Sequence, residues 1–352
     1  MSASIWFAKL HDYSGMRFSL PVVLILFVLF FAGCKHDPLD VDVSNVELEI
    51  QFQRLDQDIF ALNPAAGQTN TDAIYEKYGD FFVDYCEGVL RIGNPETEGF
   101  QYSVAQFITD ESMKTLYEDV QFEYEDVTPI EEQLTKAFRY FNYHFPDSTI
   151  PKVVFNISAL NYAIIATPTT LGIGLDMFLG ANYPIYPMVG LPKYRYDNMK
   201  PQQIVPQAMK GWLQATYETD AKRETLLDYM VFEGKLLYVL DATLRETADS
   251  TKIGFSTDAM QWCTEYEARI WAHIVDQELL YATEYMNINK WINQAPFVAG
   301  IPKDSPGRLG QWVGWQIVRK YMQENPEINM IQLMENQNSQ EILAQSKYKP
   351  RL

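Results

Sequence analysis

Histidine and cysteine are scarce in this chain of 352 residues, which has 4 histidines and 3 cysteines. No HExxH or CxxC motif occurs, so the usual zinc sites are excluded, because they need several imidazoles or thiolates on one face. The GxSxG elbow of hydrolases, the phosphate loop and the GxGxxG dinucleotide motif are also missing. We therefore expect no cofactor and no bound metal, and no residue is assigned a catalytic role.

Positive charge is also in short supply. The chain has 28 Lys and Arg against 46 Asp and Glu, and its formal net charge is −18 at pH 7. Such a protein repels nucleic acid and anionic lipid headgroups at long range. We expect no nucleic-acid partner, and we expect any membrane attachment to depend on a covalent lipid.

Long apolar runs are missing except at residues 20–32. This run is shorter than the ~20 residues that a membrane-spanning helix needs. It follows Arg17 and ends in small residues just before Cys34, a pattern typical of a bacterial lipoprotein signal. The alternative is a plain signal anchor in which the cysteine is accidental.

The signal divides the chain into three parts. We expect residues 1–33 to be a lipoprotein signal peptide with its natural start at Met16, and Cys34 to carry the lipid. Residues 34–50 contain proline and several aspartates without helical spacing, so they are expected to form a lipidated tether followed by a strand. Apolar residues make up 47% of the chain, enough to build a core. Residues 51–352 are therefore predicted to form a single globular domain.

Apolar residues recur at helical spacing over most of that domain. Two strands are expected, at 153–157, which is β-branched, and at 170–178, where glycines are typical of an edge strand or of close approach by another backbone. The predicted fold class is α+β, predominantly helical, with a small sheet. Cys86 and Cys263 either form a disulfide or remain two buried thiols. The predicted helices cover residues 53–62, 71–90, 102–120, 129–145, 204–217, 223–241, 257–285, 308–323 and 340–347.

Glu233 is the most unusual acidic residue, because it lies at the edge of the apolar face of helix 223–241. Gly234, at the centre of that face, predicts close packing against another element. A carboxylate in this position is either desolvated and paired with a protein donor or a ligand for something else. The first reading gives Glu233 a structural role, and the second makes Glu233 and Gly234 a candidate binding site or the relic of one.

Several sequence blocks together resemble the GldB family of gliding-motility lipoproteins. The resemblance implies a lipoprotein of the bacterial cell envelope, lipid-anchored and facing the periplasm, that works with other proteins of the gliding machinery. The blocks, which span most of the chain in order, are FQRLDQDIF (52–60), YEKYGDFFVDY (75–85), RIGNP (91–95), LGIGLDMFLG (171–180), VFEGKLLYVLD (231–241), KIGFS (252–256), the helix from Trp262 to Trp271, INQAPFVAGIPKDSPGRLGQWVGWQIVRKYM (292–322) and SKYKP (346–350).

The order of strands, helix 204–217 and the Glu-Gly pair at 233–234 is also similar to zincin-type metallopeptidases. In zincins the corresponding helix carries HExxH and a later Glu is the third zinc ligand. Helix 204–217 reads IVPQAMKGWLQATY, without histidine or acid, so only Glu233 matches that pattern. This resemblance implies a degenerate zincin-like domain without its metal. An unrelated helical fold with the same order of elements is the alternative.

A segment rich in tyrosine and proline, YPIYPMVGLPKYRY at 183–196, precedes that helix. Tyrosines give large contact area at low ordering cost, so this segment is a candidate partner surface, and a loop packed on the core is the alternative. The leading hypothesis is protein binding without catalysis. The rivals are a peptidase-like hydrolase that uses Glu233 with an unconventional metal site and a purely structural role in the envelope. The candidate surface residues are Tyr183, Tyr186, Tyr194 and Tyr196.

Overall fold

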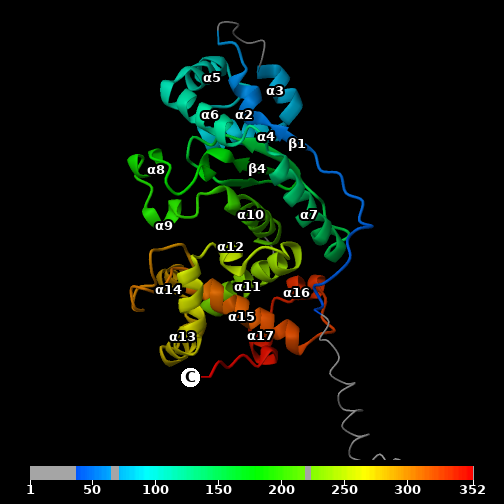
Figure 1. Ribbon diagram of the computed structural model, residues 1–352, viewed down its shortest axis with the longest axis vertical. Helices are drawn as coiled ribbons and strands as arrows, with labels where there is room; N and C mark the ends of the chain where they lie inside the picture. Colours follow the sequence, from blue (N-terminus) through cyan, green and yellow to red (C-terminus); the bar gives the residue numbers. More distant parts are fainter. Residues whose placement is uncertain (1–36, 65–70, 219–222, 352) are drawn as a thin grey trace, which may run out of the picture. The chain divides into compact units, whose positions relative to one another are not determined.

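The computed structural model of the chain describes residues 37–64, 71–218 and 223–351 (Figure 1). Its contacts divide the chain into Met1–Asp40 and Val41–Leu352, and every helix and strand described below lies in the second unit. The predicted signal peptide and Cys34 lie outside the described residues. Within the described part, no helix is both long enough and apolar enough to cross a membrane.

A four-stranded mixed sheet has the strand order β1-β2-β4-β3. β1 (Phe52–Arg54) and β4 (Thr170–Gly174) both run parallel to β2 (Lys152–Asn156), while β3 (Ile164–Ala166) pairs antiparallel with β4. Val153 pairs with Phe52 on one side and with Leu171 on the other. The inner strands β2 and β4 are almost fully buried, which explains why both read as continuous apolar runs rather than alternating ones.

Helices of the N-terminal half pack against this sheet. Leu55, Phe82 and Tyr85 are fully buried in a core that also includes Val154 of β2. The Tyr85 hydroxyl donates to the Ile157 carbonyl at 2.6 Å, which ties this layer to the end of β2. The elements are α2 (Leu55–Phe60), α3 (Thr71–Tyr78), α4 (Asp80–Asp84), the π-helix η2 (Tyr85–Leu90), α5 (Phe100–Thr109), α6 (Glu111–Glu123), α7 (Thr128–His144) and the 3-10 helix η3 (Leu175–Phe178).

The C-terminal half is helical and is built around α11 (Leu226–Thr243). All side chains from Met230 to Thr243 are buried, as expected of a helix that is apolar on nearly every face. α15 (Leu309–Glu324) packs along α11 (Figure 1). The other elements are α8 (Ile185–Met188), α9 (Lys193–Tyr196), η4 (Pro201–Gln203), α10 (Ile204–Glu218), α12 (Asp249–Ile253), α13 (Thr257–Asp276), η5 (Leu279–Tyr281), α14 (Tyr285–Ile292), α16 (Met330–Glu335) and α17 (Ser339–Ser346).

The predicted α+β class, mostly helical with a small sheet, is confirmed. The predicted helix 102–120 is wrong in its continuity, because the carboxylate of Asp110 accepts from the Ser112 and Met113 amides and begins a new helix there. The predicted helix 257–285 ends at Asp276, since Glu278 adopts a left-handed φ of 54°. Helix 71–90 is likewise interrupted at Gly79, whose φ is 59°.

The glycine-rich strand is an inner strand, so the edge-strand alternative is wrong and close approach is correct. A Cβ on Gly174 would lie 2.4 Å from the backbone oxygen of Tyr162. The strand β3, whose Ile165 Cβ lies 3.2 Å from a Cβ built on Gly172, was not predicted. Residues 37–50 contain no strand, so the strand expected there is wrong. The first strand, β1, is only three residues long and lies where a helix was predicted to begin.

Candidate functional site

Two glycines let α11 and α15 touch at backbone distance. A Cβ on Gly234 would lie 2.3 Å from the Gly314 carbonyl oxygen, and a Cβ on Gly314 would lie 1.7 Å from the Met230 oxygen. Neither position has room for a side chain. The close packing predicted from Gly234 is therefore present, and it holds the residue before it, Glu233, against the start of α15.

Glu233 is 6% exposed and is paired with a cation. Its Oε2 lies 2.8 Å from Nζ of Lys210 on α10. The same Nζ donates to Oε1 of Gln311 at 2.8 Å, and Gln311 Nε2 donates to the Ile292 carbonyl at 2.8 Å. Glu233 thus belongs to a chain of polar contacts that links α11, α10, α15 and the end of α14.

A second cation, Arg308, lies beside this pair. It is the N-cap residue of α15 with a left-handed φ of 58°. Its Nη2 donates to the Gly254 carbonyl at 2.8 Å, and its guanidinium lies 5.4 Å from the centre of the Phe255 ring. Burial lowers the pKa of Arg308 to about 10, although the Glu233 carboxylate acts in the opposite direction. Arg308 therefore remains charged at neutral pH.

Lys210 and Arg308 line a small polar cavity of about 160 Å³. Its inner wall includes the buried side chains of Met177, Met199 and Ile253. A larger hollow of about 410 Å³ adjoins it, and the two share four lining residues, namely Asn198, Gly254, Gln294 and Arg308. Together they form a cleft that begins beside Glu233 and continues over the start of α13.

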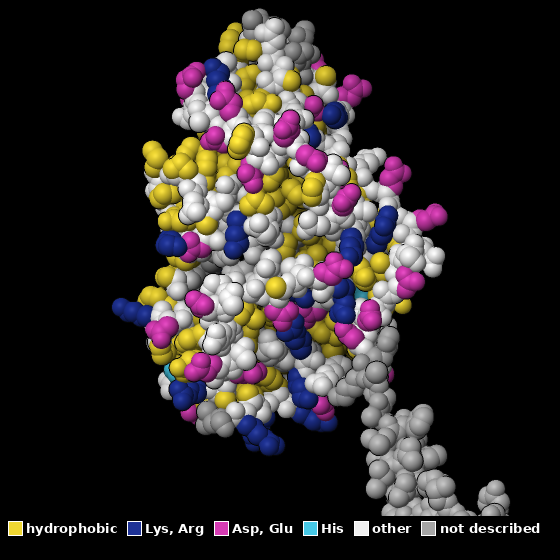
Figure 2. Space-filling view, in the orientation of Figure 1, with side chains coloured by type: hydrophobic (Ala, Val, Ile, Leu, Met, Phe, Trp, Pro, Cys, Tyr) yellow, Lys and Arg dark blue, Asp and Glu magenta, His cyan; other side chains and the backbone are white. Residues whose placement is uncertain are grey.

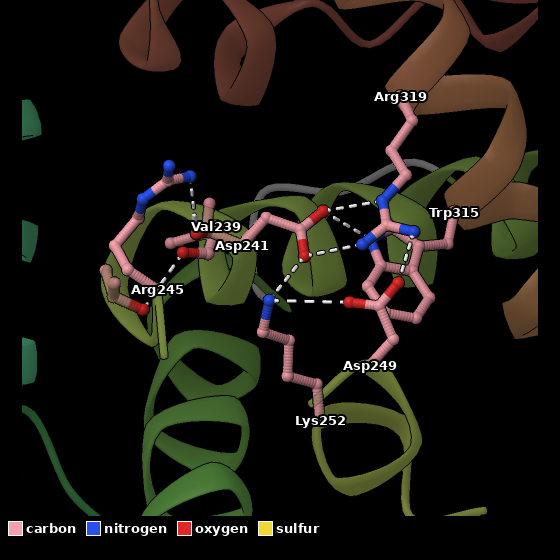
Figure 3. A network of polar contacts seen from close by, with 8 residues as sticks. Val239, Asp241, Arg245, Asp249, Lys252, Trp315 and Arg319 are labelled. Carbon is pink, nitrogen blue, oxygen red and sulfur yellow. Dashed lines mark hydrogen bonds and ion pairs between the residues drawn. The ribbon is translucent and has the colours of Figure 1, made fainter. Parts of the chain in front are cut away.

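The same helix carries a second buried carboxylate, Asp241, at the centre of another polar network (Figure 3). Asp241 accepts from Lys252 Nζ at 2.9 Å and from Trp315 Nε1 at 2.9 Å. Arg319 donates to it twice, from Nε at 2.7 Å and from Nη2 at 2.8 Å, and also reaches Asp249 at 2.7 Å. This network ties α11 to α12 and α15 and leaves no acceptor of Asp241 without a donor.

The four tyrosines of the candidate partner surface do not form an exposed group. Tyr186 is fully buried, where its hydroxyl donates to the Asp176 carbonyl at 2.8 Å, so its assignment to a surface is corrected. Tyr183 is half-buried and donates to Asp119 at 2.7 Å. Tyr196, also half-buried, stacks on the ring of Tyr186, so aromatic packing within the segment hides much of its tyrosine area.

The exposed large hydrophobic side chains of that segment are Met188, at 81%, and Val189, at 54%. Figure 2 shows hydrophobic side chains gathered at the surface where Figure 1 places α8. Tyr194 is half-buried, and it lines the larger hollow, where its backbone oxygen accepts from Gln294 Nε2 at 3.0 Å. Of the four candidate tyrosines, only Tyr194 lines the cleft, which Lys210, the ion-pair partner of Glu233, also lines. Tyr183 and Tyr186 do not line it.

Residues 36–350 match the family model of the gliding motility protein GldB, which is labelled as a lipoprotein family. This match covers most of the chain. The chain belongs to the GldB family. It is therefore related to gliding motility and to anchored proteins of the cell envelope. Neither the search of curated proteins nor that of solved structures returned a match.

The sequence reasoning missed the two cations that define the cleft of this GldB family member. Lys210 is the only charged residue in the stretch 204–217, a signal that pointed to a buried acid opposite. Arg308 gave no such signal, because its placement depends on a left-handed turn before α15. Among the described residues, no three His, Cys, Asp or Glu side chains gather in a way that could hold a metal ion.

Proposed function

We propose that this GldB family member is a lipid-anchored component of the gliding machinery that faces the periplasm and acts by binding other proteins, without catalysis. Membership of the family supports the link to gliding. The observation that favours binding over catalysis is the state of Glu233, whose carboxylate lies 2.8 Å from the ammonium of Lys210. It is already neutralised by a neighbour within the fold.

This ion pair disfavours the rival role of a peptidase-like hydrolase. A carboxylate that is to hold a metal or accept a proton needs a free lone pair directed at the reacting group. Release of Glu233 from Lys210 would leave the half-buried ammonium with only the neutral Gln311 as a partner, which is costly. The pair therefore fits a structural neighbour of a binding cleft better than an acid-base group.

The partner surface is best placed at residues 187–189 rather than at the tyrosines. The buried Tyr186 anchors α8 by its two hydrogen bonds to the η3 region, and this presents Met188 to solvent. Methionine adapts to the shape of a partner and is common at binding surfaces. The partner is another protein of the gliding machinery.

In-cell photo-crosslinking tests this proposal. A photo-reactive residue replaces Met188 in one strain and Tyr102 in another, because both side chains are 81% exposed and Tyr102 lies on another helix, α5. We expect a discrete adduct with a protein of the gliding machinery from position 188 and none from position 102. Equal background capture from both positions would remove the case for this surface.

The anchor and the absence of catalysis need separate tests. Labelled palmitate should enter the wild-type protein and not a Cys34→Ala variant, and the variant should leave the membrane fraction. Cleavage of a peptide by the purified full-length protein that disappears in Glu233→Gln would contradict the non-catalytic role, and so would stoichiometric zinc in the wild type.

A further inference from the structure

The small cavity beside Glu233 is lined by cations in a protein that is strongly acidic. Its charged lining residues are Arg195, Lys210, Lys252 and Arg308, and no acidic side chain lines it. The whole chain has a formal net charge of −18. A concentration of positive charge in such a protein is costly by self-repulsion unless something negative approaches it.

Only part of this charge is neutralised within the fold. Lys252 is paired with Asp241 at 2.9 Å, and Lys210 is paired with Glu233 at 2.8 Å. Arg308 and Arg195 have no ion pair within 4.0 Å among the described residues. Arg308 uses one N–H for the Gly254 carbonyl, and its side chain lines both the cavity and the adjoining hollow. Two guanidinium groups are thus in excess at this site.

The cavity fits one small anionic group at the end of a chain. Buried side chains, Met177, Met199, Gln203 and Ile253, close its inner wall, so an extended ligand cannot pass through it. Guanidinium groups present a fork of donors that matches a carboxylate. The amides of Asn198, Gln203, Gln207 and Gln294 add neutral hydrogen-bonding groups around this point.

The adjoining hollow has the character of a peptide groove. It is lined by apolar and ring side chains, which include Phe255, Trp262, Pro296 and Pro306, and by charged side chains of both signs, Asp197, Lys200, Asp258, Lys303 and Asp304. Arg308 and Gln294 border both spaces, so a ligand that places its charged end in the cavity continues directly into the hollow. Mixed apolar and amide linings of this kind suit a peptide better than an inorganic ion.

We propose that the cavity binds the C-terminal carboxylate of an extended peptide, whose preceding residues lie along the adjoining hollow. This inference rests on the proposed function, because a protein partner is what brings such a chain end. It assigns Arg195 and Arg308 as the groups that recognise the carboxylate, while Lys210, which is paired with Glu233 behind it, completes the cationic lining.

The test uses the full-length protein in detergent with acetyl-trialanine as the free acid and as the C-terminal amide. Binding is measured by ligand-observed NMR titration, with inorganic phosphate as a competitor. We expect the amide to bind about tenfold more weakly than the free acid, because it loses charge-assisted hydrogen bonds. An amidated peptide that carries an internal glutamate should behave like the amide.

Two variants make the test specific. Arg195→Gln removes a cavity cation that is exposed and has no side-chain bond among the described residues, so the fold should be unaffected. We expect it to weaken binding of the free acid about tenfold and to leave binding of the amide unchanged. Arg91→Gln removes the same charge from an exposed residue that does not line the cleft, and it should change neither.

Equal binding of acid and amide, or unchanged binding by Arg195→Gln, would overturn the inference. Displacement of the free acid by phosphate at similar concentration would also overturn it, in favour of a phosphate-bearing ligand. The proposed function fails separately, because the crosslinking at position 188 does not depend on the cavity. An adduct there without peptide binding rejects only this inference, and peptide binding without an adduct rejects only the proposed partner surface.

Discussion

Helix α11 carries two buried carboxylates, and their surroundings differ. Asp241 accepts four hydrogen bonds, from Lys252, Trp315 and twice from Arg319. Glu233 has one ion pair, with Lys210, and lies next to a cavity that Lys210 and Arg308 line. One carboxylate is enclosed by donors of the fold, and the other is at the inner edge of a cleft.

On this one helix, Asp241 therefore has a structural role, whereas Glu233 lies beside a cleft that can bind a ligand. A buried charge that is fully satisfied can only be disturbed at a cost, so the Asp241 network fixes α11 against α15. At the other carboxylate the cations outnumber the acids, which leaves capacity for a ligand. The four predictions that follow test this contrast, from the largest expected effect to the smallest.

Removal of the enclosed carboxylate should have the largest effect. Asp241→Ala leaves Lys252 and Arg319 with only Asp249 as an acidic partner and removes the acceptor of Trp315 Nε1, so we expect the free energy of unfolding to fall by about 4 kcal/mol. Chemical denaturation measures this. Asp84→Ala removes an exposed aspartate and should change stability by less than about 0.5 kcal/mol. A loss as small for Asp241→Ala as for the control would refute the structural role of the network.

The close crossing of α11 and α15 should be nearly as sensitive to substitution as Asp241. Gly314→Ala places a Cβ 1.7 Å from the Met230 oxygen, so the helices must move apart, at a cost of about 3 kcal/mol. Gly88→Ala, on the π-helix η2, meets nothing within 4 Å and should be neutral or slightly stabilising. Thermal unfolding of the two variants distinguishes them, and equal midpoints would show that the crossing tolerates a side chain.

A third carboxylate, Asp176, shows what happens without a cation. It is fully buried and accepts only from Ser158 and the Leu160 amide among the described residues. Burial raises its pKa to about 6 from the ordinary 3.8, although these hydrogen bonds act in the opposite direction. Between these values the folded protein binds a proton that the unfolded chain does not, so stability rises as pH falls and is lost as pH rises through 6.

Unfolding at pH 7, 6 and 5 tests this behaviour. We expect wild type to gain about 1 kcal/mol relative to Asp176→Asn as the pH falls from 7 to 5. The asparagine variant is the matched control, because it cannot take up the proton. If the stability of the two proteins changes with pH in parallel, the pKa of Asp176 is not raised by folding. Its charged form is then as well stabilised as those of the paired carboxylates.

Neutralisation of the carboxylate beside the cleft should cost little stability and improve binding. In Glu233→Gln the ion pair is lost but Lys210 Nζ keeps its hydrogen bond to Gln311, so we expect a loss of at most about 1 kcal/mol. Removal of the negative charge should strengthen binding of acetyl-trialanine free acid about fivefold. Titration of the two proteins measures this, and weaker binding by the variant would show that Glu233 itself contacts the ligand.

Much of the fold followed from local patterns. Helices predicted at 129–145, 204–217 and 308–323 begin and end within one residue of α7, α10 and α15, because their apolar spacing is regular. Helix breaks at Gly79 and Glu278 were missed, since a left-handed residue depends on its surroundings as well as on its type. The three-residue strand β3 is too short to show a period.

The site was less predictable, because its parts are distant in sequence. Gly234 in the apolar face predicted close packing, and Glu233 at its edge predicted a buried acid that needs a partner. Asp241 is bonded by Trp315 and Arg319, which are 74 and 78 residues away in the sequence. No local pattern marks either of them. The tyrosine-rich segment showed many aromatic rings without showing that Tyr186 faces the core and Met188 faces solvent.

Gliding of cells that carry Arg195→Gln tests the central claim most directly, when protein level is measured beside it and Asp241→Ala serves for comparison. The account predicts that Arg195→Gln accumulates like the wild type yet impairs gliding, whereas Asp241→Ala lowers the protein level itself. Normal gliding with Arg195→Gln would contradict a binding role for the cleft.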